Sequence, residues 1–422
     1  MRIYVDSLGC KLNQAEMEAL AAALARQGHE PAATAREADV CVLNTCAVTH
    51  VAAQKSRQAL RRLHRENPAA RIVATGCYAE LSPEVLAALP GVERVVGNAA
   101  KADIAALFAP AVVEHEVEVW PPLPRMRTRA LVKVQDGCDN ACTYCITRIA
   151  RGPQRSRPAE SVIGEVQGRV AAGYREVVLT GVHVGAYGRD RDAGGALDLW
   201  GLVRRILTET EVERLRLSSI EPWDLPEDVF GLWSDPRLCR HLHLPLQSGH
   251  DATLRRMGRR YTTGEFERLV GAARAAIAGL AVTTDVIVGF PGETEEEFGA
   301  TAAFVERMAF AGVHVFPYSA RPGTPAARME GQVAAQVTAG RAGAMRAVAA
   351  RSAAAFRQQF AGQTLPVLWE SARESARGRV WSGLTDNYLR VHAVDERDLA
   401  NRIRVTRLVR VEEDGLWGEI VA

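Results

Sequence analysis

Three cysteines within eight residues form the most specific chemical pattern in the sequence. Cys138, Cys142 and Cys145 have a C-x3-C-x2-C spacing and directly follow a β-rich run. A structural zinc site needs four ligands, usually supplied as two closely spaced pairs, and no second cysteine or histidine pair follows at a suitable spacing. Three thiolates on a cubane iron–sulfur cluster instead leave one iron open to a substrate or cofactor. The spacing therefore indicates a cluster that takes part in chemistry.

Three further cysteines share a local setting in the first 110 residues. Cys10, Cys46 and Cys77 each follow a short β-rich run and precede a helical stretch, and glycine precedes Cys10 and Cys77 directly. Alternating strands and helices predict a parallel sheet, in which ligand sites lie beyond the carboxyl ends of the strands. We expect these thiols to meet at one rim. On spacing alone, a second cluster and three buried thiols are equally good interpretations.

The remaining two cysteines, Cys41 and Cys239, lie inside apolar strand patterns and are expected to be buried thiols.

The charge balance of 52 basic against 50 acidic residues excludes a general attraction to nucleic acid or anionic membranes, so any basic surface must be local. No signal-peptide pattern or membrane-length apolar stretch is present, which predicts a cytoplasmic protein. In that reducing compartment cysteines serve as metal ligands or thiols more often than as disulfides.

The elements that must position these cysteines indicate an α/β chain with three domains. Residues 1–115 read as a parallel α/β domain, and a proline-rich break at Trp120–Pro124 separates them from residues 124–360. The second region has six strand candidates alternating with helices, which is typical of an incomplete (βα)6 version of the eight-unit barrel. Residues 362–422 carry short alternating runs between turn residues and predict a small all-β barrel.

With Tyr144 before its last cysteine, the C-x3-C-x2-C segment resembles the radical S-adenosylmethionine (SAM) enzymes. Together with the phrases around Cys10, Cys46 and Cys77, it resembles the methylthiotransferase family of that superfamily over essentially the whole chain. The resemblance implies that the open iron chelates SAM through its amino and carboxylate groups, and that an electron from the [4Fe-4S] cluster cleaves SAM to a deoxyadenosyl radical. It also implies an auxiliary [4Fe-4S] cluster on the N-terminal trio and a C-terminal TRAM domain that binds tRNA.

Candidate SAM contacts lie at the ends of the predicted barrel strands. Thr180 and Gly181 resemble the superfamily's glycine-rich contact to the methionine amine, with a plain turn as the alternative. Ser219 and Glu221 follow the third predicted strand, where their hydroxyl and carboxylate groups suit either contact with ribose oxygens or capping at the surface. Gln247 and Asp285 lie in segments that resemble the family's motifs of the later strands. The candidates of the superfamily site are Tyr144, Thr180, Gly181, Ser219, Glu221, Gln247 and Asp285.

Two groups of arginines are candidates for contact with RNA phosphates. The first group directly follows the C-x3-C-x2-C motif, and the alternative interpretation is that it is simply a solvated loop. The second alternates with Ile403 and Val405, which predicts an apolar inner face and a basic outer face on that strand. These residues are Arg148, Arg151, Arg155, Arg157, Arg402 and Arg404. Trp381 and Tyr388 suit either stacking on bases or core packing.

The phrases at residues 241–249, 315–324 and 383–388 look most like the MtaB-type branch of the family, which adds a methylthio group to carbon 2 of N6-threonylcarbamoyladenosine at position 37 of tRNA. The implied reaction uses two SAM molecules, one to methylate a cluster sulfur and one to form the radical. The resemblance also implies an electron donor such as flavodoxin or ferredoxin, and we expect a monomer. The sequence departs from relatives at Arg148-Ile149.

Other substrates and another class of protein stay open at this point. Isopentenyladenosine in tRNA and an aspartate of a ribosomal protein are the alternative substrates within the family. A non-catalytic iron–sulfur protein that binds RNA or senses redox state is the alternative class. Such a protein would bind clusters without producing 5′-deoxyadenosine, so product analysis separates the two classes.

Overall fold

The structure, a computed structural model, describes residues 1–108, 128–190, 197–376 and 378–421. It divides into two compact units. The first unit contains Met1–Ala172, Leu179–Asp198 and Ser319–Ala327, and the second contains Gly173–Val178, Leu199–Tyr318 and Arg328–Ala422. The expected break at Trp120–Pro124 lies outside the described residues, so the three domain ranges stay predictions.

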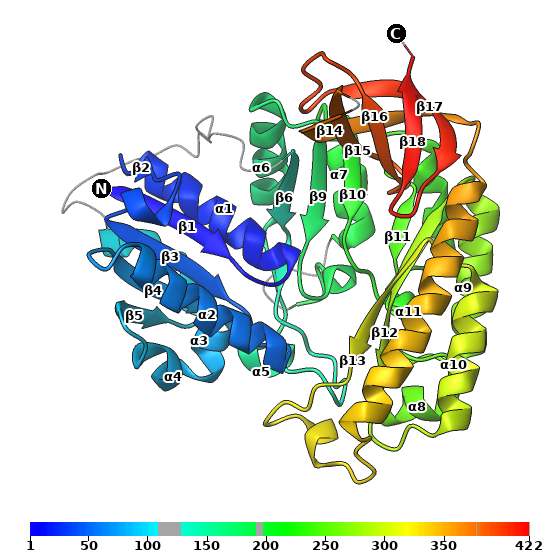
Figure 1. Ribbon diagram of the computed structural model, residues 1–422, viewed down its shortest axis with the longest axis horizontal. Helices are drawn as coiled ribbons and strands as arrows, with labels where there is room; N and C mark the ends of the chain where they lie inside the picture. The colour runs from blue at the N-terminus through cyan, green and yellow to red at the C-terminus, as the bar shows by residue number, and fades with distance from the viewer. Residues whose placement is uncertain (109–127, 191–196, 377, 422) are drawn as a thin grey trace. The chain divides into compact units, whose positions relative to one another are not determined.

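A five-stranded parallel sheet with the order β2-β1-β3-β4-β5 forms the N-terminal part of the first unit (Figure 1). Sequence periodicity predicts β1, β3 and β4 but not the edge strands, because β2 has only two residues, both exposed, and the exposed pair Glu93-Arg94 interrupts the valines of β5. The elements are β1 (Arg2–Ser7), α1 (Lys11–Arg26), β2 (Glu30–Pro31), β3 (Val40–Thr45), α2 (His50–Glu66), β4 (Arg71–Gly76), α3 (Cys77–Leu81), α4 (Pro83–Ala87) and β5 (Val92–Val96).

Both faces of this sheet are covered, as a parallel sheet requires. Val40 and Val42 of β3 pack in one core cluster with Leu20 and other residues of α1. Cys41 and Leu43, which alternate with them, pack in the opposite cluster with Leu60 and Leu63 of α2. Cys41 is completely buried there, as expected of a structural thiol.

The rest of the first unit begins the barrel and carries the second cysteine trio. Its elements are β6 (Arg129–Lys133), β7 (Gln135–Asp136), α5 (Thr147–Arg151), β8 (Arg155–Ser156) and α6 (Ala159–Ala171). Strand β9 (Glu176–Thr180) has residues in both units. In the first unit the backbone N–H of Val134 donates to the Thr180 carbonyl, and in the second unit the N–H of Arg214 donates to the carbonyl of Arg175, just before the strand. The strand order here is β10-β9-β6.

The second unit continues the barrel with the parallel order β11-β12-β13, and parallel bridges such as Ser219 to His243 connect β10 with β11. The described part of the chain thus contains six barrel strands. Its elements are α7 (Leu199–Glu209), β10 (Arg214–Leu217), β11 (His241–His243), α8 (Asp251–Arg256), α9 (Thr263–Ala276), β12 (Ala281–Val288), α10 (Glu295–Met308), β13 (Gly312–Pro317) and α11 (Ala335–Gln358). Thr262 and Thr294 close reciprocal capping boxes that start α9 and α10.

A closed barrel with the order β14-β15-β16-β18-β17 ends the chain. Its core holds the fully buried indoles of Trp369 and Trp381, so Trp381 packs inside rather than on the surface. The strands are β14 (Thr364–Ser375), β15 (Gly378–Thr385), β16 (Arg390–Val394), β17 (Ile403–Val411) and β18 (Leu416–Ile420). The predicted α/β class with a small all-β C-terminal barrel is confirmed.

Buried arginines join this small barrel to the strands of the second unit. Arg214 donates to the carbonyl oxygens of Leu384 and Pro366, and Arg216 pairs with Glu176 while donating to the carbonyl of Asp386.

No helix of the described residues has the length and apolar character needed to cross a membrane.

Candidate functional site

The three N-terminal cysteines follow adjacent strands of the parallel sheet. Cys10 is the N-cap residue of α1, Cys46 directly follows β3, and Cys77 is the first residue of α3 after β4. Register pairs Ser7 with Asn44 and Thr45 with Gly76, so the ends of β1, β3 and β4 are level. The expected convergence at one sheet edge is therefore present.

Two glycines allow the thiols to approach each other. A Cβ on Gly9 would lie 2.8 Å from the Cys46 sulfur, and a Cβ on Gly76 would lie 2.2 Å from the side-chain oxygen of Asn44. Both glycines have φ of +99°, which disfavours any residue with a side chain. The backbone around Cys46 is fixed by Ser56, whose hydroxyl accepts from the Cys46 N–H and donates to its carbonyl.

The electrostatics of Cys46 reflect its neighbours. The pKa of its thiol is raised to about 11, mainly by burial and also by negative charge on Cys77 and Cys10, while a backbone hydrogen bond at Val48 and the charge of Arg151 lower it. At neutral pH the thiol is therefore protonated when no metal is bound. Metal ligation requires the thiolate, so binding of cationic iron at this edge would release the proton.

The second trio lies on the loop between β7 and α5. The backbone N–H of Cys138 donates to the Gly152 carbonyl at 3.1 Å, and the Cys138 sulfur accepts from the N–H of Asn140 at 3.4 Å. Gly137, before the first cysteine, has φ of +69°, and a Cβ there would lie 1.8 Å from the Pro153 carbonyl oxygen. The loop thus turns through a space that admits only glycine.

The spacing of the sulfurs fits clusters better than single ions. Two thiolates on one zinc ion, each bound at about 2.3 Å, lie less than about 4.6 Å apart. Among the described residues, neither cysteine trio has all three sulfurs within 4.8 Å of one another, whereas one group of His and Asp residues meets this limit. Thiolates that bind different irons of one cluster lie farther apart than this, so the wider spacing does not conflict with a cluster, and three cysteine ligands leave one iron of a four-iron cluster open.

Gln135 connects the second trio with the end of β9. Its side-chain oxygen accepts from the N–H groups of Val182 and His183, at 3.1 and 2.8 Å, and its side-chain nitrogen donates to the carbonyls of Asp136 and Gly137. A Cβ on Gly181 would lie 2.8 Å from the Gln135 carbonyl oxygen. Thr180 is buried beside it, so the structure places this predicted SAM contact next to the cysteine loop of the first unit.

His183 and Gln135 are not among the site residues predicted from the sequence. Nδ1 of His183 lies 3.9 Å from the Cys138 sulfur and 3.3 Å from the side-chain nitrogen of Asn140, and the imidazole is buried. The sequence feature that could have indicated His183 is its position three residues after Thr180, just beyond the end of a predicted strand. Tyr144 lies within the cysteine loop and is half-buried.

The other SAM candidates belong to the second unit. Gln247 adopts φ of +65°, and its N–H donates to the Asp285 carbonyl. The Glu221 carboxylate is ion-paired with the buried guanidinium of Arg259, and the Asp285 carboxylate lies 3.2 Å from His243. Ser219 is exposed. Glu221 and Asp285 therefore already have side-chain partners, while Gln247 contributes its backbone to the end of β12.

Arg151, expected on a basic loop, is instead the centre of a buried charge network. Its guanidinium is 2% exposed and donates to Glu16, Asp136 and Asn13, with Nη1 at 2.8 Å from Glu16 and 2.9 Å from Asp136. Lys101 and Lys133 also bind Glu16, at 2.6 and 3.0 Å. Burial alone would raise the pKa of Glu16, but Arg151 and the two lysines together hold it well below its ordinary value.

This network connects the segments that carry the two cysteine trios. Arg151 ends α5, the helix after Cys145, whereas Asn13 and Glu16 lie on α1, the helix after Cys10. Asn13 Oδ1 accepts from Arg151 at 2.6 Å and lies 3.7 Å from the Cys10 sulfur. These contacts favour a structural role for Arg151 in place of the expected phosphate contact.

The other candidate RNA arginines are more accessible. Arg148 and Arg155 are exposed, whereas Arg157 is half-buried and pairs with Glu165 at 2.6 Å. Arg402 and Arg404 are exposed near the start of β17. The expected alternation is wrong at Val405, which is 48% exposed, because Thr406 and Leu408 are the buried positions of this strand.

Gly137 and Gly152 offer a test of how the cysteine loop is held. Both have positive φ, but a Cβ at Gly152 would meet no atom within 4 Å, whereas one at Gly137 meets backbone. We expect Gly137→Ala to lower the iron content and SAM cleavage severely. Gly152→Ala carries only the conformational cost of its backbone (φ +73°, ψ −162°), about 1–3 kcal/mol, and should keep both. Iron analysis of the reconstituted proteins measures the difference, and equal iron content in the two variants would contradict this account.

The comparisons with known proteins match two regions of the chain, each of which contains one cysteine trio. Residues 2–97 match the family described as "Uncharacterized protein family UPF0004", and residues 132–305 match the "Radical SAM superfamily". The chain is 40% identical over 427 residues to "Threonylcarbamoyladenosine tRNA methylthiotransferase MtaB" of Bacillus subtilis (strain 168), covering 97% of this chain and 94% of that protein. The chain belongs to the radical SAM methylthiotransferase family.

Other relatives support this membership over nearly full length. The Chlamydia pneumoniae protein of the same name is 38% identical, with 98% of this chain and 97% of that protein covered. "tRNA-2-methylthio-N(6)-dimethylallyladenosine synthase" of Maricaulis maris (strain MCS10) is 33% identical, with coverage of 99% and 97%.

A solved structure shares the fold. The radical SAM methyltransferase TsrM from Kitasatospora setae superposes with a TM-score of 0.57 at 17% identity, covering 77% of this chain and 73% of that chain. Members of the radical SAM superfamily are enzymes that use SAM and a [4Fe-4S] cluster, so the chain is an enzyme of this class.

Proposed function

We propose that this enzyme adds a methylthio group to carbon 2 of N6-threonylcarbamoyladenosine at position 37 of tRNA. The observation that carries the proposal is one unit that contains two cysteine trios, each with three sulfurs and a glycine that admits no side chain. The branch is supported by the names of the relatives at 40% and 38% identity. Relatives named for the dimethylallyl nucleoside make isopentenyladenosine the second candidate.

Cys138, Cys142 and Cys145 would hold the cluster that binds SAM, and Cys10, Cys46 and Cys77 would hold an auxiliary cluster. When bound, the two [4Fe-4S] clusters supply the electron that cleaves SAM and the sulfur of the methylthio group. The chain's own contribution is position: Arg151 ties α5 to α1, so the two cysteine-bearing segments are held in one packing arrangement. Such positioning is how a protein brings reactive groups within reach.

The thiol environments suit these roles. Cys46 is a poor ligand while its pKa is about 11, and a bound cationic iron would shift it to the thiolate. Thr180 and Gly181 are the proposed SAM contacts, because the Gln135 side chain hydrogen-bonds both to His183, in the loop that follows them, and to Gly137, beside Cys138. His183, close to the Cys138 sulfur, joins Tyr144 as a residue beside the proposed cluster.

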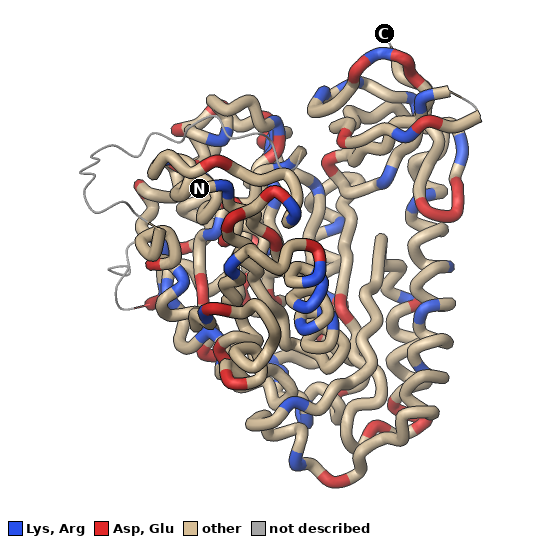
Figure 2. The backbone as a smooth tube through the Cα atoms, turned by 60° about the vertical axis from the view of Figure 1, so that its left-hand side comes forward, with Lys and Arg blue, Asp and Glu red and all other residues tan. Residues whose placement is uncertain are grey.

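The remaining parts of the proposal concern partners and place. The enzyme would act on tRNA in the cytoplasm as a monomer and receive electrons from a donor such as flavodoxin or ferredoxin. Exposed Arg148 and Arg155 near the cysteine loop, and Arg402 and Arg404 on the C-terminal TRAM barrel, would contact RNA phosphates. Charges of both signs are interspersed along the chain (Figure 2), so a few specific arginines must make these contacts.

Mass spectrometry of tRNA nucleosides tests the substrate. We expect deletion of the gene to remove the methylthio group from threonylcarbamoyladenosine and leave the isopentenyl nucleoside unchanged. Restoring the gene should restore the modification, and restoring a Cys77→Ala copy should not. Loss of sulfur from the isopentenyl nucleoside alone would show that the branch is wrong. No change in either nucleoside would overturn a tRNA substrate and leave the ribosomal aspartate.

The salt dependence of tRNA binding tests the barrel arginines. Replacing both Arg402 and Arg404 by alanine should weaken binding and reduce the slope of log affinity against log salt by roughly one per arginine. Arg351→Ala is the matched control, because Arg351 is also exposed but lies on α11 and pairs with Glu306. An unchanged slope in the double variant would contradict phosphate contact at β17.

A further inference from the structure

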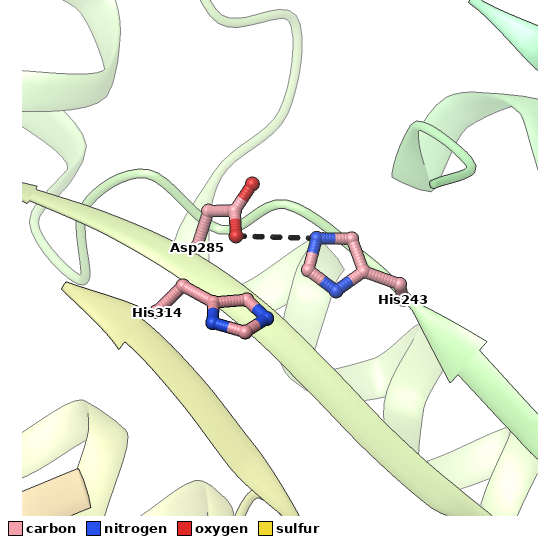
Figure 3. A group of neighbouring side chains, drawn as sticks. All are labelled: His243, Asp285 and His314. Atoms are coloured by element: carbon pink, nitrogen blue, oxygen red, sulfur yellow. Dashed lines mark ion pairs between the residues drawn. The ribbon is translucent and has the colours of Figure 1, made fainter. Parts of the chain in front are cut away.

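Three donor side chains on adjacent strands converge in the second unit, whereas both cysteine trios belong to the first. His243 ends β11, Asp285 lies in β12, and His314 lies in β13. Among the described residues, they form the single group of three whose ligand atoms all lie within 4.8 Å of one another. Figure 3 shows the His243 ring directed at the Asp285 carboxylate, with the His314 ring beside both.

Strand register explains why these side chains share a face. Asp285 pairs directly with His314, and His243 pairs with Thr283, two residues before Asp285. Residues two apart in a strand point to the same side of the sheet. The convergence is therefore a consequence of the parallel pairing of β11, β12 and β13, which fixes the backbone on which all three donors stand.

Thr283 fixes the orientation of His243. Its hydroxyl oxygen lies 2.9 Å from Nδ1 of His243 and 2.9 Å from Nε2 of His241. This contact leaves Nε2 of His243 to face Asp285, 3.2 Å from its carboxylate oxygen. A histidine that binds a metal through one nitrogen is commonly held by a polar partner at the other nitrogen, and Thr283 occupies that place.

Two imidazoles and one carboxylate form the donor set typical of mononuclear Fe2+ sites with open positions, and they also suit Zn2+. Two donors on one zinc ion lie roughly 3–4 Å apart, so the His243–Asp285 distance already fits, and His314 is near enough to close the set. We propose that His243, Asp285 and His314 bind one divalent transition-metal ion, distinct from the iron–sulfur clusters. Asp285 is then a metal ligand instead of the expected SAM contact.

The ion would keep positions for water or another ligand. Among the residues that the structure describes, three protein donors converge, the Asp285 side chain is 24% exposed, and His314 is exposed. Donors of this kind do not suit magnesium or calcium, which take oxygen ligands, and no sulfur is present to favour copper(I).

Cobalt binding to the reconstituted enzyme tests the site. The holoenzyme, with oxidised clusters that give no EPR signal, is dialysed against Co2+ without oxygen, and cobalt is measured by mass spectrometry and by high-spin EPR. We expect one Co2+ per chain. His243→Ala, Asp285→Asn and His314→Ala should each bind it at least tenfold more weakly, with cluster iron unchanged. Thr283→Val should bind it about 10- to 100-fold more weakly.

The matched control is His392→Ala, because Nε2 of His392 lies 3.5 Å from Asp414 in an acid–histidine pair without a second histidine. This variant should bind Co2+ as the wild type does. Absence of saturable binding in the wild type, or unchanged affinity in any of the three ligand variants, overturns the site. The Thr283→Val result keeps the test decisive if a ligand variant fails to fold. Because neither readout uses tRNA or SAM cleavage, failure here is distinct from failure of the proposed function.

Discussion

Replacing Cys138 by alanine will abolish formation of 5′-deoxyadenosine, whereas replacing Cys77 will preserve it and abolish methylthiolation. The two cysteines belong to trios on different loops, one between β7 and α5 and one along the edge of the N-terminal sheet. Only the trio that contains Cys138 is proposed to bind the SAM that is cleaved. Chromatography of the nucleoside product and mass spectrometry of modified tRNA measure the two outcomes on the same reconstituted protein.

Iron content gives an independent reading of the same variants. Each single replacement should remove about half of the iron, since each trio is proposed to hold one four-iron cluster. Cys41→Ala and Cys239→Ala are the matched controls: both thiols are buried, Cys41 within β3 and Cys239 two residues before β11, and their pKa values are raised, mainly by burial, to about 11 and about 12, respectively. These variants should keep both clusters and both activities. Identical behaviour of the Cys138 and Cys77 variants would contradict the division of roles.

The convergence of Cys10, Cys46 and Cys77 was predictable because it follows from local rules. A parallel sheet places the carboxyl ends of neighbouring strands together, and an apolar run ending in a glycine or polar residue marks each end. The six barrel strands and the all-β C-terminal region were predictable for the same reason, since hydrophobic periodicity is a short-range signal.

The role of Arg151 was not predictable in this way. A loop with four arginines in ten residues has the pattern of a solvated, phosphate-binding surface. The burial of Arg151 depends on Glu16 and Asn13 of α1, which are 135 and 138 residues away in the sequence. The inner face of β17 was not predictable for a similar reason. Closure of the barrel places Thr406 and Leu408 inside, although Val405 is more apolar than its neighbour Thr406.

Arg151→Ala will destabilise the first unit more than any change of an exposed ion pair. Removal of one partner of a buried charge pair costs about 3–5 kcal/mol, because the opposite charge stays buried. Lys101 and Lys133 still face Glu16, so we expect about 3 kcal/mol. For a unit of this size, that lowers the thermal midpoint by roughly 6–12 °C. Arg2→Ala is the control, because the Arg2–Glu37 pair is exposed and should contribute about 0–1 kcal/mol.

The pH dependence separates lost charge pairing from lost packing. The pKa of Glu16 is held well below its ordinary value of 4.5, so its charge stabilises the folded state fully above that value, and this contribution disappears as the pH falls toward the folded pKa. Glu16→Gln should therefore lower the thermal midpoint of the cluster-free protein near pH 7, and the gap to wild type should narrow as the pH falls below about 4.5. A gap that stays constant down to the acid limit would assign the stabilisation to shape alone. A narrowing gap shows that ionic contacts hold together the two helices that follow the cysteine trios.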